Sequence, residues 1–396
     1  MFFRLKDFDF KDKRALVRVD FNVPVDKSNS IADDSRIRKT LPTLNYILSK
    51  KAKQLIIVSH FGRPEGEHKP EFSLKPIAKR LKELLSKEVW LVPTPKAFDI
   101  TKFPENKVIM LENIRFDKGE EANDDNLAKK LASFADLFVF DAFGVSHRSQ
   151  ASVTGVQKYL PSCAGFLMEK EIEFLRGVVE NPKKPFTAII GGAKEDKIDV
   201  IDKLITKVDN LIVGGILANT FMKAKGINIG ASKFSKETLD YAKKIIGQYE
   251  KKINLPVDYI VADRFSADAN IKCVGLPDNI DGWMIMDIGP YTISGYKDIL
   301  SKSNTVVWAG PIGVFEWESF RRGTFDIATH LAGLDIVKVI GGGDSGDAIE
   351  KFGLADKMTH VSTGGGASLE LLSGKELPGV KALEENYLKF KEKFIH

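Results

Sequence analysis

Arginines and runs of glycine, two residue types that bind anions in different ways, are distributed unequally along this chain. Ten of the thirteen arginines lie at or before Arg176, and every run of adjacent glycines lies after position 190. The runs are Gly191-Gly192, Gly214-Gly215, Gly341-Gly342-Gly343 and Gly364-Gly365-Gly366. Guanidinium groups bind anions through side chains, whereas glycine turns bind phosphate through backbone N–H groups. We therefore expect two anion sites, one in each half, and two phosphorylated ligands.

The elements that position these residues can be predicted from the sequence, in which short apolar runs alternate with longer helical patterns. The runs lie at residues 15–19, 55–58, 89–92, 108–111 and 137–140, and then at 187–190, 211–213, 259–261, 305–308, 336–340 and 358–361. Runs that are apolar on both faces are typical of parallel strands covered by helices on both sides. Residues 74–85, 126–134 and 234–249 carry helical periodicity. The pattern predicts the α/β class, as two Rossmann-like three-layer αβα domains with parallel sheets.

A helical pattern near the middle of the chain divides it. Residues 166–180 read as a helix that the sequence NPKKP ends. A chain of 396 residues is natural for two domains. We predict an N-terminal domain of residues 1–167 and a C-terminal domain of residues 168–376, with residues 168–180 as a hinge helix.

The overall composition excludes several classes of protein. The formal net charge is only +5 and the lysines are spread over many helices, so a nucleic-acid partner is not indicated. Only Cys163 and Cys273 are present, which argues against a disulfide framework or a cysteine zinc site. The first residues lack the apolar region of a signal peptide, and no apolar run could span a bilayer. We expect a cytoplasmic protein with no membrane partner.

Polar side chains follow the apolar runs of the first half. They include Asp20, Asn22, His60, Arg63, Glu112, Asn113, Arg115, Asp141, His147 and Arg148, with Arg36 and Arg38 at the head of the next helix after the first run. Parallel strands end at one edge of a sheet, where ligands bind. Guanidinium groups gathered there would repel one another without an anion between them. With no cysteine or carboxylate cluster beside them, a metal site is the weaker interpretation.

Glycine turns follow the apolar runs of the second half. Gly191 and Gly192 precede Lys194, and the sequence GGGDSG at 341–346 carries Asp344. Turns that lead into helices can hold phosphate on backbone N–H groups. The Walker pattern is absent, and GGGDSG fits the dinucleotide pattern GxGxxG only formally, because Asp344 would point a carboxylate at the pyrophosphate. A phosphate–Mg²⁺–Asp344 arrangement fits better.

Longer motifs connect these residues to a known family. They are RVDFNVP at 18–24, SHFGRP at 59–64, LENIRF at 111–116, DAFGVSHR at 141–148, GGAK at 191–194, LPVDYIVAD at 255–263, GPIGVFE at 310–316, GGGDS at 341–345 and THVSTGGGASLELL at 359–372. Through these motifs, in family order, the chain resembles phosphoglycerate kinase over essentially its whole length. The resemblance implies reversible phosphoryl transfer from 1,3-bisphosphoglycerate to ADP in glycolysis, giving 3-phosphoglycerate and ATP, by a monomer that uses Mg²⁺ with the nucleotide.

The resemblance also assigns individual residues. It implies that the N-terminal lobe binds the phosphoglycerate, through Asp20, Asn22, Arg36, His60, Arg63, Arg115 and Arg148. It implies that the C-terminal lobe binds the nucleotide, through Gly192, Ala193, Lys194, Lys197, Gly215, Pro311, Glu316, Gly341, Gly342, Gly343, Asp344 and Ser345. In such enzymes Glu316 would hold the ribose hydroxyls and Asp344 would face the metal. Residues 377–396 would return to pack on the N-terminal lobe.

The chain departs from the family pattern at three places. Only Glu195 stands between GGAK and Asp196, where the family has two residues, as in GGAKVSDKI. Either Lys197 turns by about 100° on its helix or the loop absorbs the deletion. Ala309 replaces the asparagine of WNGP, and Tyr291 follows DIGP in place of lysine or glutamate. We expect weakened or rearranged nucleotide contacts, with the activity kept.

The expected reaction needs no general base, because the acceptor carboxylate is already ionised at neutral pH. Catalysis then consists of bringing two polyanions into line and stabilising the moving phosphoryl group. We assign that role to Arg36 and Lys194, assisted by the turns at Gly343 and Gly366. Two other hypotheses remain: a nucleotide-responsive binding protein that has lost turnover, and an NAD-dependent dehydrogenase, which rests on GxGxxG alone.

Overall fold

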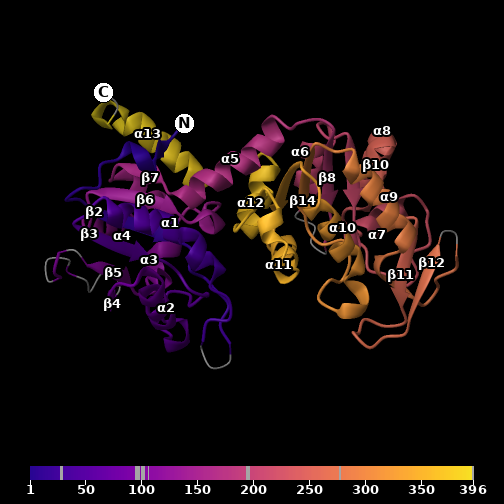
Figure 1. Cartoon of the computed structure of the whole chain (residues 1–396), viewed down its shortest axis with the longest axis horizontal. Helices are drawn as coiled ribbons and strands as arrows, with labels where there is room; N and C mark the ends of the chain where they lie inside the picture. Colours follow the sequence, from indigo (N-terminus) through magenta and orange to yellow (C-terminus); the bar gives the residue numbers. More distant parts are fainter. Residues whose placement is uncertain are drawn as a thin grey trace. The chain divides into compact units, whose positions relative to one another are not determined.

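The protein, seen in a computed structural model, is described at residues 1–26, 30–93, 99, 103–105, 107–192, 197–275 and 278–394. It divides into two compact units. Unit 1 contains Met1–Ile172 and Glu376–His396, and unit 2 contains Glu173–Lys375. The boundary between them falls inside one helix, α5 (Phe166–Glu180). Figure 1 shows helices packed around the strands of each unit.

Unit 1 is built on a parallel sheet. Among the described residues it has seven strands in the order β1-β7-β6-β2-β3-β5-β4. They are β1 (Phe3–Arg4), β2 (Arg14–Val19), β3 (Gln54–Val58), β4 (Val89–Val92), β5 (Val108–Leu111), β6 (Leu137–Asp141) and β7 (Ser162–Ala164). Every neighbouring pair is parallel. The predicted strands therefore form, and the prediction of a parallel sheet is confirmed for this unit.

Two helices of unit 1, at residues 75–85 and 125–132, lie where helical periodicity was predicted, and the unit has others beside them. The helices of the unit are α1 (Ser35–Ser49), α2 (Lys75–Leu85), α3 (Lys118–Glu121), α4 (Asp125–Ala132), the first part of α5 and α13 (Pro378–Phe394). In α2 the buried Ile77, Leu81 and Leu85 recur every four residues, so they form one stripe that packs on the sheet. The N-cap Asp124 of α4 accepts a hydrogen bond from the backbone N–H of Leu127 at 2.8 Å, which satisfies a free donor of the first turn.

The C-terminal helix completes the core of unit 1. The ring of Phe3 lies 4.9 Å from that of Tyr387, and the ring of Phe8 lies 4.8 Å from that of Phe394. Asn386 ties α13 to β7, because its Oδ1 accepts a hydrogen bond from Ser162 N at 2.9 Å. Figure 1 accordingly shows the two chain termini close together on this unit.

Unit 2 has a second parallel sheet. Among the described residues its six strands have the order β10-β9-β8-β14-β15-β16. They are β8 (Phe186–Ile190), β9 (Asn210–Val213), β10 (Ile253–Asn254), β14 (Thr305–Ala309), β15 (Val337–Gly341) and β16 (His360–Val361), and all pairs are parallel. The helices are α6 (Ile198–Ile205), α7 (Gly215–Ala224), α8 (Leu239–Tyr249), α9 (Pro290–Ser301), α10 (Arg322–Ala332), α11 (Gly343–Lys351) and α12 (Gly365–Leu372).

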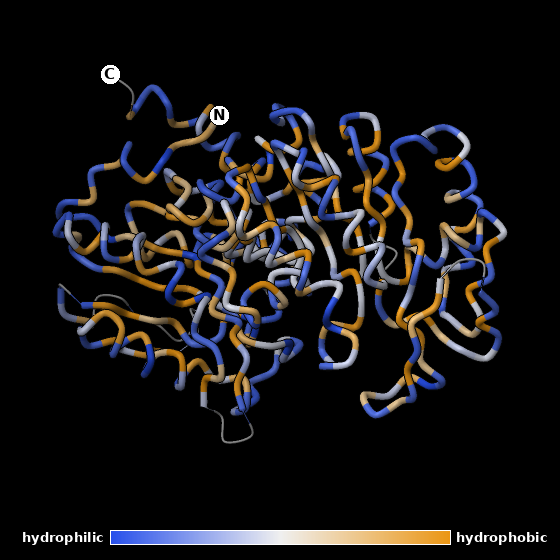
Figure 2. Tube along the Cα trace, turned by 45° about the vertical axis from the view of Figure 1, so that its right-hand side comes forward, coloured by the Kyte–Doolittle hydropathy of each residue, from blue (hydrophilic) through white to orange (hydrophobic). Residues whose placement is uncertain are grey.

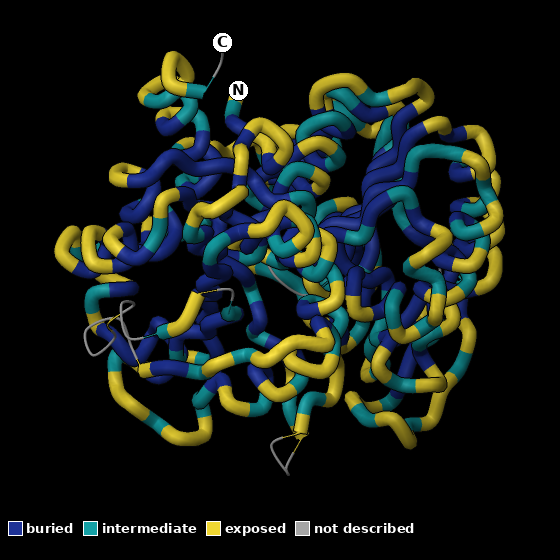
Figure 3. Tube along the Cα trace, turned by 60° about the vertical axis from the view of Figure 1, so that its left-hand side comes forward, coloured by how far each residue is buried: buried dark blue, intermediate teal, exposed yellow. Residues whose placement is uncertain are grey.

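In each unit, the strands of its parallel sheet form the buried interior. Figure 2 shows hydrophobic residues gathered along the strands, and Figure 3 shows the same segments buried while the outer turns are exposed. Every residue of β3, β5, β8 and β14 is buried. This burial on both faces is why the strands read as continuous apolar runs, and the predicted α/β class is confirmed.

One predicted strand has a different partner arrangement. The run at 259–261 lies in β11 (Asp258–Ala262), which pairs antiparallel with β12 (Ile271–Gly275) and β13 (Met284–Ile288) in a third sheet. The expectation that all such runs belong to two parallel sheets is therefore wrong here. Only residues 263–270 join β11 to β12, and a parallel crossover needs a dozen or more residues.

The start of α5 is held by a buried carboxyl group. Asp141, the last residue of β6, accepts a hydrogen bond from Met168 N at 3.0 Å, and Thr43 of α1 accepts one from Phe166 N at 3.0 Å. Burial raises the pKa of Asp141 to about 7, although hydrogen bonds from Thr43 and the α5 backbone oppose the rise. The carboxyl group thus connects three elements, β6, α1 and α5.

This carboxyl group predicts a pH dependence of stability. Its folded-state pKa of about 7 lies above the ordinary value of 3.8, so its contribution is full below pH 4 and is lost as the pH rises through 7. Replacing Asp141 by asparagine removes the titration. From pH 5 to pH 8 the free energy of unfolding of the variant should therefore gain about 2–3 kcal/mol relative to the wild type. Urea unfolding at several pH values measures the difference, and parallel curves for the two proteins would contradict it.

Candidate active site

Each parallel sheet reverses its direction of winding at its centre. In unit 1 β2 pairs with β3 on one side and with β6 on the other. In unit 2 β8 pairs with β9 on one side and with β14 on the other. Ligands of open α/β sheets bind beyond the carboxyl ends of the strands at such reversals. Several of the predicted residues follow these strand ends, namely Asp20, His60 and Arg148 in unit 1 and Gly192, Gly215 and Pro311 in unit 2.

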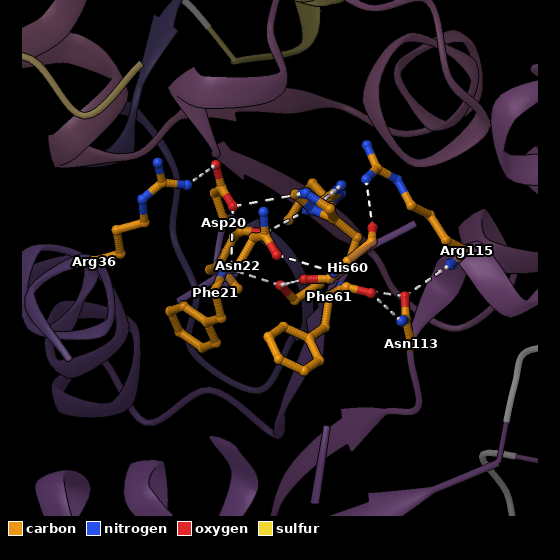
Figure 4. A network of polar contacts seen from close by, with 12 residues as sticks. Asp20, Phe21, Asn22, Arg36, His60, Phe61, Asn113 and Arg115 are labelled. Atoms are coloured by element: carbon orange, nitrogen blue, oxygen red, sulfur yellow. Dashed lines mark hydrogen bonds and ion pairs between the residues drawn. The ribbon is translucent and has the colours of Figure 1, made fainter. Parts of the chain in front are cut away.

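The first site is organised around Asp20, which follows β2. Its Oδ2 lies 3.1 Å from Nη1 of Arg36, in the first turn of α1, and its Oδ1 lies 3.9 Å from Nε2 of His60, which follows β3. Figure 4 shows Arg36 and His60 on opposite sides of this carboxylate. The structure therefore brings three of the predicted substrate residues together at one edge of the sheet.

Hydrogen bonds between side chains and backbone fix the loops that carry the predicted residues. Asn22 Oδ1 accepts from Gly62 N at 2.9 Å, and Nη1 of Arg115 donates to Gly62 O at 2.8 Å. Asn113 joins the same loop, because its Oδ1 accepts from Phe61 N and its Nδ2 donates to Phe61 O. Figure 4 shows this network between the loops after β3 and β5. The edge is consequently held in place before any ligand arrives.

The edge has a strongly positive character. Burial, with the nearby charges of Arg18 and Arg148, lowers the pKa of Arg115 to about 10. Burial also lowers the pKa of His60 well below its ordinary value. Burial alone would raise the pKa of Asp20, but His60, Arg36 and Arg18 hold it below its ordinary value. A concentration of positive charge with one carboxylate suits a polyanion that also carries a hydroxyl group.

The remaining arginines differ in position. Arg63 is exposed after β3, and Arg148 is half-buried after β6, where its charge reaches Arg115. Arg38 forms an ion pair with Asp34 at 2.7 Å on the outside of α1. Arg38 is therefore separated from the group around Asp20, while the other two stand at the expected edge.

The glycine turns of unit 2 bring strand ends into close backbone contact. A Cβ atom on Gly191 would lie 2.2 Å from Pro311 O, and one on Gly215 would lie 2.7 Å from Gly192 N. Only glycine permits these approaches. Helices α7, α11 and α12 begin at glycines of the predicted turns, so their free N–H groups lie beside the strand ends. Ser345 stabilises this region, because its Oγ accepts from Gly310 N at 3.1 Å and donates to Gly341 O at 2.5 Å.

Lys197 points into the same group of turns. It is buried at the N-cap of α6, and its Nζ donates to Gly191 O at 2.5 Å. A Cβ on Gly310 would lie 2.2 Å from that Nζ, so the ammonium group stands between the ends of β8 and β14. Despite the missing residue before it, Lys197 is placed beside the glycine turns.

A cavity of about 560 Å³ adjoins the turns. Its lining contains five predicted nucleotide residues, of which two are carboxylates: Gly192, Gly215, Pro311, Glu316 and Asp344. The rest of the wall is largely apolar and comes from α7, β11 and β13 with the loop after β14; it includes Met222, Tyr259, Met284, Met286, Ile312 and Trp317. A cavity with an apolar wall and a few converging polar groups is typical of a site for a flat organic ligand.

Two predicted nucleotide residues have no described position, whereas two of the departures from the family pattern can be located. Ala193 and Lys194 lie outside the described residues. Ala309 is fully buried at the end of β14, opposite Ile190 and Gly341. Tyr291 is exposed in the first turn of α9. The two substitutions therefore occur in different settings, one inside the sheet and one in solvent.

Neither a metal cluster nor a membrane span occurs in the part of the chain that the structure describes. No group of three or more histidine, cysteine, aspartate or glutamate side chains there could hold a metal ion. No helix there is both long enough and apolar enough to cross a membrane. Asp344 stands in the first turn of α11, where a single carboxylate could complete the shell of a cation that phosphates already bind.

Comparison with known proteins identifies the family. The phosphoglycerate kinase family model matches residues 5–375. The chain belongs to the phosphoglycerate kinase family. The predicted family is confirmed, and so is the predicted class of activity, a phosphotransferase with a carboxyl group as acceptor.

Individual relatives of this phosphoglycerate kinase family member cover nearly its whole length. The cytosolic phosphoglycerate kinase of Triticum aestivum is 51% identical over 96% of this chain and 98% of its own. The phosphoglycerate kinase of Thermosipho africanus is 49% identical over 96% of this chain and 97% of its own. The structure of phosphoglycerate kinase from Coxiella burnetii matches with a TM-score of 0.88 at 41% identity, covering 97% of this chain and 99% of that chain. The enzyme from Pyrococcus horikoshii matches with a TM-score of 0.86 at 34% identity, covering 98% and 100%.

Sequence reasoning missed two kinds of site residue. The apolar wall of the cavity has no sequence signal, since its residues look like any other core residues. Arg18 lies within the apolar run at 15–19, yet it is a fully buried charge that contacts His60 behind the predicted substrate edge. A charged residue inside a run that is otherwise apolar on both faces was the available signal.

Proposed function

We propose that this protein catalyses direct in-line phosphoryl transfer from 1,3-bisphosphoglycerate to ADP, and the reverse reaction, in glycolysis. The observation that supports this most strongly is the presence of two different anion-binding edges. One carries Arg36, His60 and Arg115 in unit 1. The other combines glycine turns with a cavity of about 560 Å³ in unit 2. The first edge suits the phosphorylated acid and the second suits the nucleotide.

The acid site works mainly by charge and hydrogen bonding. Arg63, Arg115 and Arg148 follow separate strand ends and bind phosphate oxygens. The carboxylate of Asp20 accepts a hydrogen bond from the hydroxyl group, and the amide of Asn22 forms another hydrogen bond with it. Arg36 contacts Asp20 with one Nη and keeps its other donors available. These donors bind the carboxylate or acyl phosphate and stabilise the charge that spreads over the moving phosphoryl group.

The nucleotide site is divided between an apolar wall and polar turns. The base packs against the apolar wall of the cavity, and Glu316 accepts hydrogen bonds from the ribose hydroxyls. The phosphates lie on the N–H groups at the starts of α7 and α11 and beside Lys197, with Gly343 and Gly366 at the exposed ends of their turns. Asp344 would help to hold the Mg²⁺ that accompanies the nucleotide as part of that substrate, and the cation would neutralise charge on the phosphates.

Lys194 is proposed as the second charge-stabilising residue, opposite Arg36 on the transferred group. Its place in the GGAK motif, two residues after Gly192, supports this role. No base is required, since the acceptor carboxylate is ionised at neutral pH. Catalysis therefore depends on alignment and on preorganised positive charge.

In-line transfer requires the two bound ligands to meet, so we propose that the units close about α5. Closure also excludes water, which would otherwise hydrolyse the acyl phosphate. Small-angle scattering should show a smaller radius of gyration with 3-phosphoglycerate and Mg-ATP together than with either alone. An unchanged radius at saturating concentrations of both would count against closure.

A coupled assay tests the proposed activity. ATP formation from 1,3-bisphosphoglycerate and ADP should be readily measured for the wild type and abolished by Lys194→Ala. Intact binding of both ligands by a well-folded protein without turnover would instead favour a nucleotide-responsive binding protein. Hydride transfer to NAD in the absence of ATP formation would favour a dehydrogenase.

We also propose a cellular location and an oligomeric state for the protein. The protein is a cytoplasmic monomer, for which the cytosolic naming of the Triticum aestivum and Nicotiana tabacum relatives gives support. Light scattering coupled to size exclusion should give the mass of one chain, 44.0 kDa. A mass of two chains would contradict the monomer.

A further inference from the structure

Behind the acid-binding edge lies a buried chain of polar groups that the proposed mechanism does not use. Arg18 in β2 and Glu120 in α3 are both fully buried. Nε of Arg18 donates to Ser152 Oγ at 2.7 Å. Ser152 in turn donates to Glu120 twice, from Oγ to Oε1 at 2.6 Å and from N to Oε2 at 2.9 Å. Removing a buried charge from water is costly unless it is paired, so the network must hold Arg18 in a defined position.

The end of this network is the imidazole ring of His60. Nη2 of Arg18 lies 3.3 Å from Nδ1 of His60, whose side chain is 4% exposed. A guanidinium group has only donors, so Nδ1 must be the acceptor in this contact. The ring is then neutral and carries its proton on Nε2, the nitrogen that faces Asp20. Arg18 itself is fully buried and therefore does not reach a ligand at the edge.

The gap on the other side of the ring leaves this proton for a ligand. Nε2 of His60 and Oδ1 of Asp20 are 3.9 Å apart, which is too long for a hydrogen bond. Asp20 Oδ1 already accepts from Asn22 N at 3.2 Å, and its other oxygen accepts from Arg36. The Nε2–H group is thus oriented toward the predicted substrate edge, between the carboxylate and the arginines.

We propose that Arg18 is a positioning residue, held by Ser152 and Glu120, which orients His60 as the neutral Nε2–H tautomer so that it donates one hydrogen bond to an oxygen of the phosphorylated acid. The proposal rests on the proposed function for the identity of that acid. Four charged groups face the ring from the elements around it: Arg18 from β2, Asp20 from the following loop, Arg36 from α1 and Arg115 from the loop after β5. Three of the four are cationic, and they oppose a charged imidazole.

Nitrogen-15 NMR of the ligand-free protein labelled at histidine tests the tautomer without any assay of activity. The wild type should show His60 with an unprotonated, hydrogen-bonded Nδ1 and a protonated Nε2 down to acidic pH. A proton on Nδ1, or titration of His60 at the ordinary pH of a histidine, would overturn the proposal. Because ligand and turnover are absent, this result is independent of whether the proposed function holds.

Kinetics of Arg18→Met then test the positioning role. The variant should raise the KM for 3-phosphoglycerate about ten-fold, the value of one hydrogen bond, and leave the KM for ATP unchanged. Loss of the Arg18 charge should also raise the pH at which His60 titrates. Arg14→Met is the matched control, because Arg14 starts the same strand at the opposite edge of the sheet. An equal rise in KM for both variants would overturn the role of Arg18.

A second variant tests the proposal even if Arg18→Met does not fold. Ser152→Ala removes the hydroxyl group that joins Arg18 to Glu120, with a smaller change of volume. It should raise the same KM in the same direction, by about three-fold, and weaken the Nδ1 hydrogen-bond signature of His60. A folded Ser152→Ala protein with unaltered KM and an unaltered His60 spectrum would show that the network does not position the ring.

Discussion

Replacing Arg36 by alanine is expected to lower kcat about a thousand-fold, since a cationic group on the moving phosphoryl group contributes on that scale. Arg36 is well placed for this role. Its Nη1 lies 3.1 Å from Asp20 Oδ2, and its side chain is 36% exposed, so other donors remain available to a ligand. Because the stabilised charge develops during transfer, kcat should fall more than the affinity for 3-phosphoglycerate. Steady-state kinetics in the ATP-forming direction give kcat, and calorimetric titration gives the affinity.

Arg38→Ala is the matched control for this prediction. Arg38 stands in the same first turns of α1, is 53% exposed and pairs with Asp34 at 2.7 Å on the outside of the helix. An exposed ion pair contributes little, so kcat should change less than about two-fold. Comparable losses of kcat in both variants would mean that Arg36 acts only through the general charge or stability of α1.

Replacing Gly310 by alanine is expected to reduce the free energy of unfolding by about 3 kcal/mol. Gly310 has φ +92°, and an added Cβ would lie 2.2 Å from the carbonyl oxygen of Gly191. The obstruction is backbone at the centre of the sheet, so it cannot be relieved by turning a side chain. The same change pushes β8 and β14 apart beside Lys197, so the affinity for ADP should fall with the stability. Urea unfolding and calorimetric titration measure the two effects.

Gly247→Ala provides the control for an added methyl group. Gly247 is exposed near the end of α8, and no atom would lie within 4 Å of a Cβ added there. Alanine is favoured over glycine inside helices, so this variant should gain about 0.5–1 kcal/mol. A loss below about 1 kcal/mol for Gly310→Ala would show that the two strand ends can separate without breaking the sheet.

The elements that carry the sites were predictable because buried strands and helix faces give recognisable apolar patterns in the sequence. Strand β8 is buried along its whole length and reads as an apolar run that stops at Gly191. Helix α5 begins and ends at the residues that the periodicity and the NPKKP stop indicated. The residues that follow parallel strands lie at one edge of the sheet. The sheet edges that carry Asp20 and Gly192 could therefore be predicted without knowledge of the strand order.

Other features depend on contacts that sequence patterns do not record. The run in β11 would be apolar with either parallel or antiparallel neighbours. The antiparallel pairing with β12 is set by the segment 263–270, which is too short for a parallel crossover. The apolar wall of the cavity, for example at Tyr259, is indistinguishable from core until the fold leaves a space beside it. The buried network behind His60 joins residues up to 134 positions apart, Arg18 and Ser152, so neither suggests the other.

The roles of the individual site residues remain predictions, and the position of Lys194 lies outside the described residues. Lys197, three residues further along the chain, is described. Its Nζ reaches Gly191 O at 2.5 Å, so the ammonium group still stands at the turn that precedes the deletion. Lys197 therefore stands beside the turn that we assign to the nucleotide phosphates.

The central claim is that unit 1 binds the phosphorylated acid and unit 2 binds the nucleotide, each through its own anion edge. Calorimetric titration of two variants, Arg115→Met in unit 1 and Glu316→Gln in unit 2, against both ligands tests this claim most directly. Arg115→Met should weaken 3-phosphoglycerate at least about ten-fold and ADP less than about two-fold, because a lost charged hydrogen bond has that effect. Glu316→Gln should weaken ADP and leave 3-phosphoglycerate unchanged. If either variant weakened both ligands equally, or if the pattern were reversed, the assignment of the two ligands to the two units would be wrong.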